Sequence, residues 1–568
     1  MPAIVLVFIG LGLFYLAYRT YAKFLAEKIY RLDPNFKTPA HEFEDGVEYV
    51  PTNKHILMGH HFVSVAGAAP IVGPAIAMIW GWLPAFLWIV VGSIFGSGAH
   101  DFGSIWVSSR HHGRSIGDLT ASLISQRTRA IFLIVIYFLV LMVNAVFALV
   151  IAALFIRYPT SVIPIFIEIP IALVIGWLLY RYKKAGVLLP SIAAVAIMYL
   201  FVILAGLYGW EVKIPAIGTP IVTWVLVLVG YGFISTLLPI WVLLQPRDYI
   251  NGHQLYLGLG VVFLAVLVGT FTAGGLPIVA PAVRLSPPGA PAMIPFLFVT
   301  IACGAISGFH AIVSSGTTSK QLNSELDARP VGYLGSLGEG SLAIATILAC
   351  AAGFATAGAW SQHYATWGGA AGLGAKVGAF VNGIGYILHH SFGITPVIGA
   401  TFAAVVVVSF AATTMDTGLR LQKYVTAEMG DLLDIPFLKI GWVATFIAAG
   451  TTALLALHDG QGKGGLIIWP LFGTTNQLLA SLALLVISVF LKKLKRPTVY
   501  TLCPMVLLLI VTTWAMLFVL KNFWVKANWG LFLIGAVILI SAVYMVVESV
   551  QAMKGAGRAE EAAVGAGG

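Results

Sequence analysis

The segment that decides the fold reads His60-His61-Phe62-Val63-Ser64-Val65-Ala66-Gly67-Ala68-Ala69-Pro70-Ile71-Val72-Gly73-Pro74. Two glycines and two prolines interrupt an apolar segment that is long enough to cross a bilayer. Proline removes a helix hydrogen bond, and glycine weakens a helix. Backbone groups freed inside hydrocarbon need a partner, because leaving them unpaired costs several kcal/mol each. A bound solute or ion is one such partner, so the segment predicts a broken transmembrane helix at a binding site.

The composition of the whole chain supports a membrane protein. Hydrophobic residues make up 59% of the 568 residues and charged residues only 10%, and the mean hydropathy is +0.94. A soluble domain carries about 25% charged residues. The composition therefore excludes a soluble domain and predicts an all-α polytopic membrane protein. No P-loop motif is present, so ATP is not expected to drive this protein directly.

A spanning helix needs about 20 predominantly apolar residues, and the chain contains about 15 such segments. They lie near 2–18, 56–79, 82–107, 130–156, 164–181, 188–209, 220–244, 253–273, 294–314, 339–358, 395–414, 437–456, 465–491, 499–520 and 529–550. Two further features leave the count open. The Gly-rich segment 371–394 and the segment 465–480 are both candidates for re-entrant structures.

The lysines and arginines indicate the orientation of the chain. With the N-terminus outside and the spans alternating, 25 of the 32 basic residues fall inside, and seven fall outside: Arg157, Lys213, Arg284, Lys376, Lys463, Lys521 and Lys526. This bias predicts an external N-terminus and a cytoplasmic C-terminus. Because the net charge of +10 follows one side of the membrane, no nucleic-acid partner is expected.

A second segment resembles the first. The seventh span contains Gly230-Tyr231-Gly232-Phe233-Ile234-Ser235-Thr236-Leu237-Leu238-Pro239. It lies five spans later and would run in the opposite direction. Interrupted segments at matching positions in two inverted halves indicate a transporter binding site. The substrate-binding candidates are therefore Gly67, Ala68, Ala69, Gly73, Gly230, Gly232, Ser235 and Thr236. The alternative is that these glycines and prolines only kink packed helices.

This pattern divides the chain into several parts. Residues 56–209 and 219–420 form the two inverted repeats. An extra N-terminal helix at 1–18 and a cytoplasmic segment at 19–55 precede them, and C-terminal helices at 437–550 follow. Residues 551–568 are expected to be a disordered cytoplasmic tail. Within 19–55, the run His41, Glu42, Glu44, Asp45 and Glu48 is interpreted as a solvated acidic loop rather than a metal cluster.

Ionisable groups in the membrane are costly and tend to be functional. His60 and His61 start the second span, and His100 and Asp101 lie near the inner end of the third. A His–Asp pair is suited to relaying protons because histidine titrates near neutral pH. Zinc ligation and ordinary interface contacts are the alternatives.

The ninth span offers further candidates for ion coupling. His310 lies one helical turn before Ser314, and Ser315 and Thr318 follow. These hydroxyls are candidate cation ligands, although such side chains often bond their own helix backbone.

Four polar residues are candidates for gating or support. Asp416 and Arg420 are spaced for a salt bridge along one helix, and Asn476 and Gln477 are spaced to bond across helices. We expect no catalytic residue, no resident metal and no cofactor. No His-Glu-x-x-His segment of a metallopeptidase is present.

Several blocks resemble the carbon starvation protein A (CstA) family. They are His60-His61-Phe62, the stretch from Ala66 to Pro74, His100-Asp101-Phe102, Arg110 with Gly113-Arg114-Ser115, Met415-Asp416-Thr417, and the block from Trp469 to Ala480. The resemblance spans most of the chain. It implies a carrier of the prokaryotic cytoplasmic membrane with a LeuT-like 5+5 inverted repeat. It also implies peptide uptake during carbon starvation, or pyruvate uptake together with protons.

Together these observations predict a secondary transporter rather than an enzyme. Its cargo is expected to be a small carboxylate such as pyruvate, or a short peptide, coupled to protons rather than to sodium. Both cargoes present a carboxylate, which exposed helix N-termini favour. The lipid bilayer is the other expected partner, and the oligomeric state stays open. The alternatives are a solute sensor without flux and a membrane-embedded metal-dependent hydrolase.

Overall fold

The architecture is helical throughout the described chain. The computed structural model describes residues 1–46, 48–181, 188–212, 214–215, 217–272, 274–368, 373–459 and 464–565, which contain helices and two isolated bridges but no strand. Twelve helical segments in these ranges are long and apolar enough to cross a membrane, or 13 if one bent pair is counted as a span.

The helices fall into two groups, those of the membrane body and shorter ones between them. Those of the membrane body are α1 (Ile4–Arg19), α4 (Lys54–Val65), α5 (Ala69–Ala77), α6 (Trp82–Val91), α7 (Gly98–Ser109), α9 (Gln126–Arg157), α10 (Val162–Arg181), α11 (Leu188–Tyr208), α12 (Pro220–Leu237), α13 (Leu244–Phe271), α14 (Met293–Thr300), α15 (Gly308–Gly316), α16 (Gly335–Ala352), α19 (Leu373–Phe392), α20 (Pro396–Leu432), α21 (Gly441–Ala456), α22 (Gly464–Lys493), α23 (Val499–Val525) and α24 (Trp529–Gly565). Short helices between them include α2 (Tyr21–Phe24), α3 (Pro39–Glu42), α8 (Ile116–Leu123) and α17 (Ala357–His363).

The count of spans is lower than the 15 expected, and the reasons are local. The expected span 56–79 is the bent pair α4 and α5. The expected span 294–314 consists of two short helices, α14 and α15. The expected span 437–456 is α21, which has only 16 residues. Apolar composition predicted these segments correctly as helical, but it did not reveal where the helices end.

The predicted break in the first segment is confirmed. α4 ends at Val65, α5 begins at Ala69, and the two axes differ by 51°. Gly67 sits in this break without room for a side chain. A Cβ added there would lie 2.4 Å from the ring of Phe147 and 3.0 Å from the hydroxyl oxygen of Thr414. The break therefore packs directly against α9 and α20.

The predicted break in the seventh span is wrong. α12 continues through Gly230 and Thr236 to Leu237. Gly232 instead gives space to a neighbour, because a Cβ there would lie 2.3 Å from the side chain of Leu419. The second interruption lies at 301–307, between α14 and α15, where Gly304 has a φ of +92°.

Neither candidate re-entrant segment folds back within the described residues. α19 is one helix over 373–392, and α22 is one helix over 464–493 that contains Pro470. Residues 371 and 372 of the predicted hairpin lie outside the described part of the chain. The question that the sequence left open is therefore answered for the described residues, where both segments are continuous helices.

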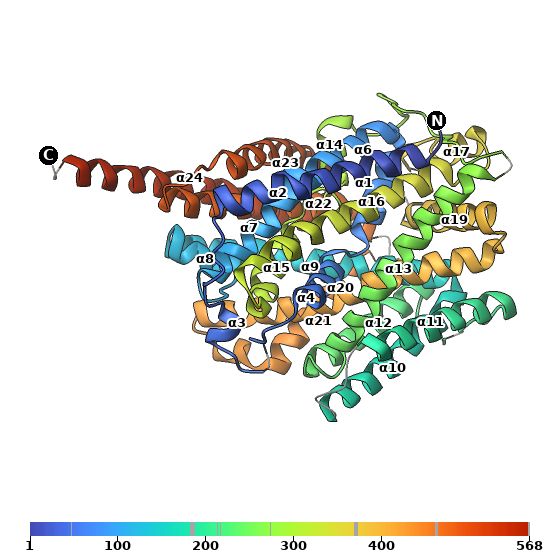
Figure 1. Cartoon of the computed structure of the whole chain (residues 1–568), viewed down its shortest axis with the longest axis horizontal. Helices are drawn as coiled ribbons and strands as arrows, with labels where there is room; N and C mark the ends of the chain where they lie inside the picture. The colour runs from blue at the N-terminus through green and yellow to red at the C-terminus, as the bar shows by residue number, and fades with distance from the viewer. Residues whose placement is uncertain are drawn as a thin grey trace.

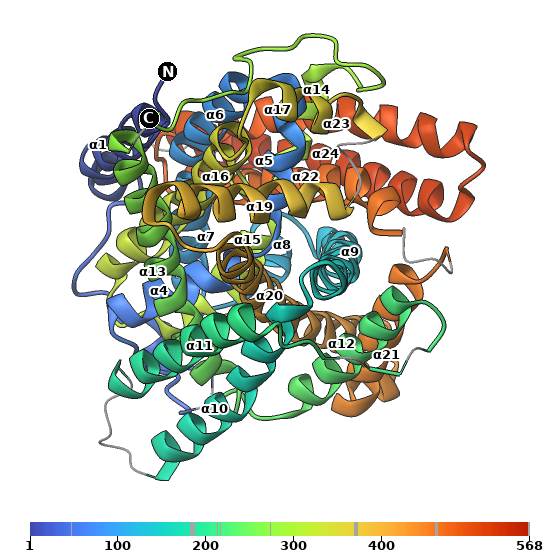
Figure 2. The ribbon, with the colours of Figure 1, turned by 90° about the vertical axis from the view of Figure 1, so that its right-hand side faces the viewer.

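Two long helices form the centre of the molecule. α9 and α20 pack against each other along their length, and Figure 2 shows them end-on between the other helices. A side-chain hydrogen bond from Asn144 Nδ2 to Gln422 Oε1, 2.8 Å long, joins them inside the core. Gly418 leaves the space that Asn144 occupies. α20 also contacts α4 and α12.

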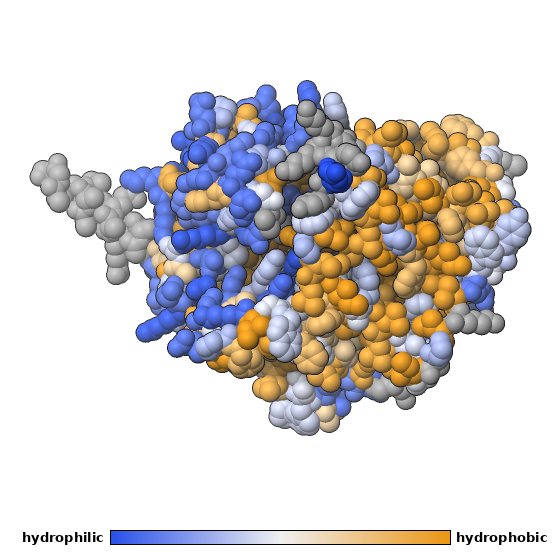
Figure 3. Space-filling view, turned by 90° about the horizontal axis from the view of Figure 1, so that it is seen from below, coloured by the Kyte–Doolittle hydropathy of each residue, from blue (hydrophilic) through white to orange (hydrophobic). Residues whose placement is uncertain are grey.

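The outer helices present an apolar surface. Large side chains stay exposed on α10, α23 and α24, including Trp177, Ile510 and Leu533. Figure 3 shows a broad hydrophobic region next to a hydrophilic end. An exposed apolar surface of this extent fits a lipid environment. The helices and this surface together describe a multi-pass membrane protein.

The start of α1 and the far end of α24 lie at opposite ends of the molecule. Figure 1 places the start of α1 at one end, and α3, α8 and the far end of α24 toward the other. We call the latter the α3 end. α24 continues to Gly565, so the backbone expected to be a disordered tail from 551 is helical as far as it is described, and residues 566–568 lie outside the described residues.

Candidate functional site

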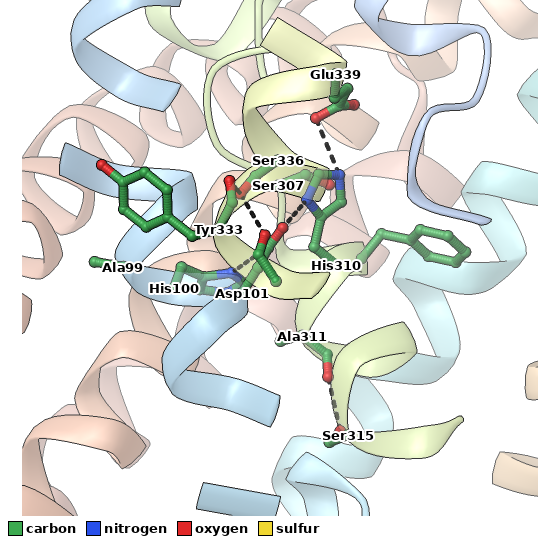
Figure 4. A network of polar contacts seen from close by, with 12 residues as sticks. Ala99, His100, Asp101, Ser307, His310, Ala311, Ser315, Tyr333, Ser336 and Glu339 are labelled. Carbon is green, nitrogen blue, oxygen red and sulfur yellow. Dashed lines mark hydrogen bonds and ion pairs between the residues drawn. The ribbon is translucent and has the colours of Figure 1, made fainter. Parts of the chain in front are cut away.

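Four titratable side chains form a continuous chain in the core. Asp101 lies between two imidazoles, with Oδ1 2.7 Å from Nδ1 of His100 and Oδ2 2.8 Å from Nδ1 of His310. The other nitrogen of His310, Nε2, lies 3.2 Å from Oε2 of Glu339. All four side chains are buried. Figure 4 shows this chain, which links α7, α15 and α16.

Glycines allow each of these three helices to pack closely against a neighbouring segment. A Cβ at Gly98 of α7 would lie 2.6 Å from the Tyr333 ring, and one at Gly308 of α15 would lie 2.4 Å from the backbone oxygen of Asn476. Gly335 begins α16 against the ring of His61. The glycine-rich composition thus serves close packing around the titratable chain, as expected for membrane helices.

The two histidines of the second span do not join this chain directly. His60 Nδ1 lies 2.8 Å from Oδ2 of Asp248 on α13. His61 Nδ1 lies 2.9 Å from Oγ1 of Thr318, and its other nitrogen has no hydrogen-bond partner. The predicted group of His60, His61, His100 and Asp101 is therefore divided among three places in the structure.

The predicted cation ligands at the end of α15 are mostly engaged within the protein. Ser315 Oγ donates to the backbone oxygen of Ala311 and accepts from the backbone N–H of Ile116. Thr318 Oγ1 pairs with His61. Ser314 Oγ is buried and has no hydrogen-bond partner, so it alone of the three stays available to a ligand.

A second buried group of ionisable side chains surrounds Arg247. Its Nε lies 3.2 Å from Oε1 of Glu168, and its Nη1 lies 2.5 Å from Oδ2 of Asp416. Nη1 also donates to the hydroxyl of Tyr231, which in turn donates to Asp416. Arg247 and Glu168 are 1% and 0% exposed. Two carboxylates thus share one guanidinium in the core.

The predicted salt bridge along α20 does not form. Asp416 pairs with Arg247, whereas Arg420 Nη2 donates to the backbone oxygens of Ser235 and Leu238. Those oxygens belong to the end of α12. Arg420 therefore caps the helix that the sequence assigned to substrate binding.

Asn476 and Gln477 hold the two sides of the second break. Asn476 Oδ1 accepts from the backbone N–H of Phe309 in the first turn of α15. Gln477 Nε2 donates to the backbone oxygen of Phe298 in the last turn of α14. Ser93 Oγ donates to the oxygen of Gly304 between them. Side chains of this protein thus satisfy backbone groups that the interruption frees.

The first break lies among unpaired hydroxyls. Ser64 Oγ, at the end of α4, and Thr414 Oγ1, beside Gly67, are buried and have no hydrogen-bond partner. Ala68 and Ala69 are buried in the same break, whereas Gly73 packs against the backbone oxygen of Thr300. Unpaired polar groups in a core need an explanation, and a bound solute or ion is one.

The second set of substrate candidates lies on the unbroken α12. Gly230 is exposed, and no atom lies within 4 Å of a Cβ built on it. Thr236 Oγ1 is buried without a partner, and Ser235 contacts Arg420 through its backbone. Gly67 and Gly232 both face α20, at Thr414 and Leu419, so α20 lies between the two sets of candidates.

Sequence reasoning did not select Arg247 or Glu339 as site residues. Arg247 precedes the apolar segment expected to begin at 253, and Glu339 stands at the expected start of the span 339–358. In the structure their helical segments begin at Leu244 and Glu325, which places both side chains in the core. The sequence did contain a signal for a buried charge at both positions, since each is a charged residue next to an apolar segment.

The part of the chain that the structure describes offers no obvious metal centre. No group of three or more His, Cys, Asp or Glu side chains suited to a metal ion occurs among the described residues. The buried polar groups are instead arranged as chains of hydrogen bonds and ion pairs between helices. Such chains are suited to moving or holding protons.

The class of protein follows from the fold together with its relatives. A bundle of at least 12 apolar helices carries buried ionisable groups and an interrupted helix, and the relatives described next are transporters. The chain is a multi-pass bacterial membrane transporter. It belongs to the carbon starvation protein CstA family, whose model matches residues 2–362 and 359–515. This confirms the resemblance seen in the sequence.

Curated relatives cover most of this chain. A peptide transporter CstA of Campylobacter jejuni is 34% identical over 575 residues, which cover 90% of this chain and 79% of the relative. A pyruvate/proton symporter BtsT of Escherichia coli is 32% identical over 606 residues, covering 91% and 81%. A peptide transporter CstA of Bacillus subtilis is 30% identical and covers 92% and 91%.

A solved structure of a manganese transporter from Eremococcus coleocola, in complex with an aromatic bis-isothiourea compound, is also similar. Its TM-score is 0.48 at 13% identity, with 90% of this chain and 98% of the other covered.

Proposed function

We propose that this transporter is a proton-coupled symporter that takes up a small carboxylate such as pyruvate, or a short peptide, during carbon starvation. The observation that carries the proposal is the buried chain His100–Asp101–His310–Glu339. Two acids and two imidazoles alternate along it, so a proton has several adjacent positions within one network.

The position of this chain supports a role in coupling. It joins α15, which follows the second break, to α7 and α16. A change of protonation alters the charge that holds these helices together in a low-dielectric environment, where such interactions are strong. Proton binding can therefore bias one arrangement of the helices over another, which is what coupled transport requires.

The relatives support the range of substrates. Their names give peptides in one case and pyruvate with protons in another. We place the substrate at the α4–α5 break, where Ser64 and Thr414 carry unpaired hydroxyls. We assign the α3 end to the cytoplasm of a prokaryotic cell and the N-terminus to the outside, since most basic residues then lie inside. We retain the LeuT-like repeat as part of this proposal.

Uptake into proteoliposomes tests the proposal. Labelled pyruvate and labelled dialanine are each offered with an inward proton gradient, an inward sodium gradient, or neither. We expect uphill accumulation of one of them only under the proton gradient. Asp101→Asn and His310→Gln should lose uphill accumulation, whereas His458→Gln, at an exposed position beyond α21, should retain it.

Other outcomes would replace the proposal. Accumulation at the rate of the unmodified protein in both Asp101→Asn and His310→Gln would remove this chain from coupling. Binding of a solute without flux would favour a sensor. Conversion of the solute, abolished by a chelator, would favour a metal-dependent hydrolase.

A further inference from the structure

A pocket at the α3 end has no role in the coupling chain described above. It lies between α4, the start of α13, the segment after α15, and α20. Its polar lining includes Ser64, Lys320, Thr417, Arg420 and, from the segment after α3, Glu48. Ser64 is one residue before the end of α4, so the pocket reaches toward the first break.

The charges in this pocket favour an anion. Among the described residues that line it, Glu48 is the one carboxylate, whereas Lys320 and Arg420 are both cations. Burial opposes the charge of Lys320, but the hydrogen bond and the charge of Glu48 outweigh it and raise the pKa of Lys320 above its usual value. Lys320 is therefore a cation at neutral pH.

Three buried donors in the pocket have no partner. Ser64 Oγ, Thr417 Oγ1 and Arg420 Nε make no hydrogen bond within the protein, and their residues are 1%, 5% and 8% exposed. Two bonds from Arg420 Nη2 to backbone oxygens hold the guanidinium in place. A fixed guanidinium with an unpaired N–H is suited to a carboxylate.

Glu48 occupies the cationic side of the pocket in this structure. Its Oε2 lies 2.7 Å from Nζ of Lys320, and the two side chains are 36% and 19% exposed. Asp45 Oδ1 accepts from the backbone N–H groups of Glu48 and Tyr49, which fixes the turn. The Tyr49 ring lies beside Lys320 Nζ, with the centroid 5.4 Å away. The carboxylate of Glu48 thus stands where a free carboxylate would bind.

We propose that this pocket is a carboxylate-binding site on the cytoplasmic side, in which Arg420 and Lys320 bind a small carboxylic acid anion and Glu48 takes its place on Lys320 when the site is empty. This inference rests on the proposed function for the assignment of the α3 end to the cytoplasm. The anion would accept from Arg420 Nε and from the hydroxyls of Thr417 and Ser64, and it would displace Glu48 toward solvent.

The size of the pocket limits the ligand. Its cavity volume is about 50 Å³, and one water needs about 10–15 Å³ on this measure. The cavity therefore has room for a few water molecules. A three-carbon acid is closer to this size than a dipeptide, and an outward movement of Glu48 would add to the space. The site thus favours a small carboxylate over a peptide.

Calorimetric titration of the purified full chain in detergent tests the site. The probes are pyruvate, inorganic phosphate and dialanine. We expect pyruvate to bind, and Glu48→Gln to tighten its binding by about tenfold, because the anion no longer competes with one charge-assisted hydrogen bond. Glu44→Gln removes the same charge at an exposed position of the same segment, so its pyruvate affinity should match that of the unmodified protein.

Two further variants separate binding from folding. Lys320→Gln and Thr417→Val should each weaken pyruvate binding while leaving the bonds of Arg420 to α12 in place. The site is overturned if Glu48→Gln and Glu44→Gln bind pyruvate equally. It is also overturned if phosphate or dialanine binds more tightly than pyruvate, or if no folded variant binds pyruvate.

The two proposals fail in different ways. If pyruvate binds with the expected order of variants but no proton-driven uptake occurs, the transport mechanism is wrong and the site stands. If proton-driven uptake occurs while Glu48→Gln leaves pyruvate affinity unchanged, the transport mechanism stands and this site is wrong.

Discussion

Asp101 connects His100 to His310 in the titratable chain. Each of its carboxylate oxygens contacts a different imidazole, His100 on the same helix and His310 on another. Because His310 also reaches Glu339, a proton gained at one position changes the charge felt at the next. The four groups therefore form one connected network rather than separate pairs.

The first prediction concerns Glu339. Glu339→Gln keeps the size of the side chain but removes one of the two acids of this chain and the ion pair with His310. It should therefore weaken the dependence of uptake on external pH. Uptake measured against external pH checks this. Glu211→Gln, at an exposed position between α11 and α12, is the control and should keep the original profile.

The second prediction concerns Arg247. Arg247→Leu leaves Glu168 and Asp416 buried without their cation, and breaking a buried ion pair costs about 3–5 kcal/mol. We expect a clearly lower melting temperature in detergent, measured by thermal size-exclusion chromatography. Arg127→Leu, at an exposed position in the first turn of α9, should melt like the unmodified protein. Equal melting of the two variants would show that the Arg247 cluster does not stabilise the fold.

At the residue scale, the sequence predicted the titratable groups better than their partners. The adjacency of His100 and Asp101 was visible in the chain, and His310 was recognised as intramembrane. Glu339 was not recognised as intramembrane, because Gly332, Gly335 and Gly338 lower the mean hydropathy of the segment that precedes it. Those glycines exist for close packing against Phe102, His61 and Phe62, which is a property of tertiary structure and not of a single segment.

At the element scale, the two breaks differ in how their backbone is satisfied. The break between α14 and α15 is bonded by Ser93, Asn476 and Gln477. The break between α4 and α5 lies beside unpaired hydroxyls of Ser64 and Thr414. The second break is therefore supported by the protein, whereas the first offers groups to a ligand.

The third prediction tests that support. Asn476→Leu keeps a similar volume but leaves the backbone N–H of Phe309 without its acceptor. An unpaired buried donor costs about 1–3 kcal/mol, so the melting temperature should fall and uptake should decrease. Asn522→Leu, exposed near the end of α23, is the matched control. If both variants melt and transport alike, Asn476 does not support the break.

The sequence located one break correctly and the other incorrectly for a physical reason. In the first, two prolines and two glycines occur within nine residues from Ala66 to Pro74. In α12, Gly232 serves packing against Leu419, and Pro239 lies beyond the helix end at Leu237. The second break, at 301–307, contains only Gly304 and no proline. Its apolar residues are typical of an uninterrupted helix.

At the scale of the whole molecule, an exposed apolar surface lies beside a hydrophilic end (Figure 3). The loop at 274–292 lies with the N-terminus, since Ala3 N–H donates to the oxygen of Leu276. The segment with Glu44 lies at the α3 end. These two loops therefore report on opposite sides of the membrane.

The fourth prediction tests the orientation. Single cysteines are introduced as Ser286→Cys and Glu44→Cys, both at exposed positions, in a background with Cys503→Ser, because Cys303 and Cys350 are buried. An impermeant maleimide added to intact cells should label only the Ser286→Cys protein. Labelling of only the Glu44→Cys protein would reverse the proposed topology.

The contrast between the two breaks has a mechanical consequence. Asn476 and Gln477 are adjacent on α22 and hydrogen-bond to the two sides of the α14–α15 break. We therefore expect the α14–α15 break to stay rigid. Among the described contacts, no pair of adjacent side chains bonds both sides of the α4–α5 break. We therefore expect the α4–α5 break to act as the hinge. A cysteine cross-link that fixes α4 relative to α5 should therefore stop transport, whereas one that fixes α14 relative to α15 should leave transport intact.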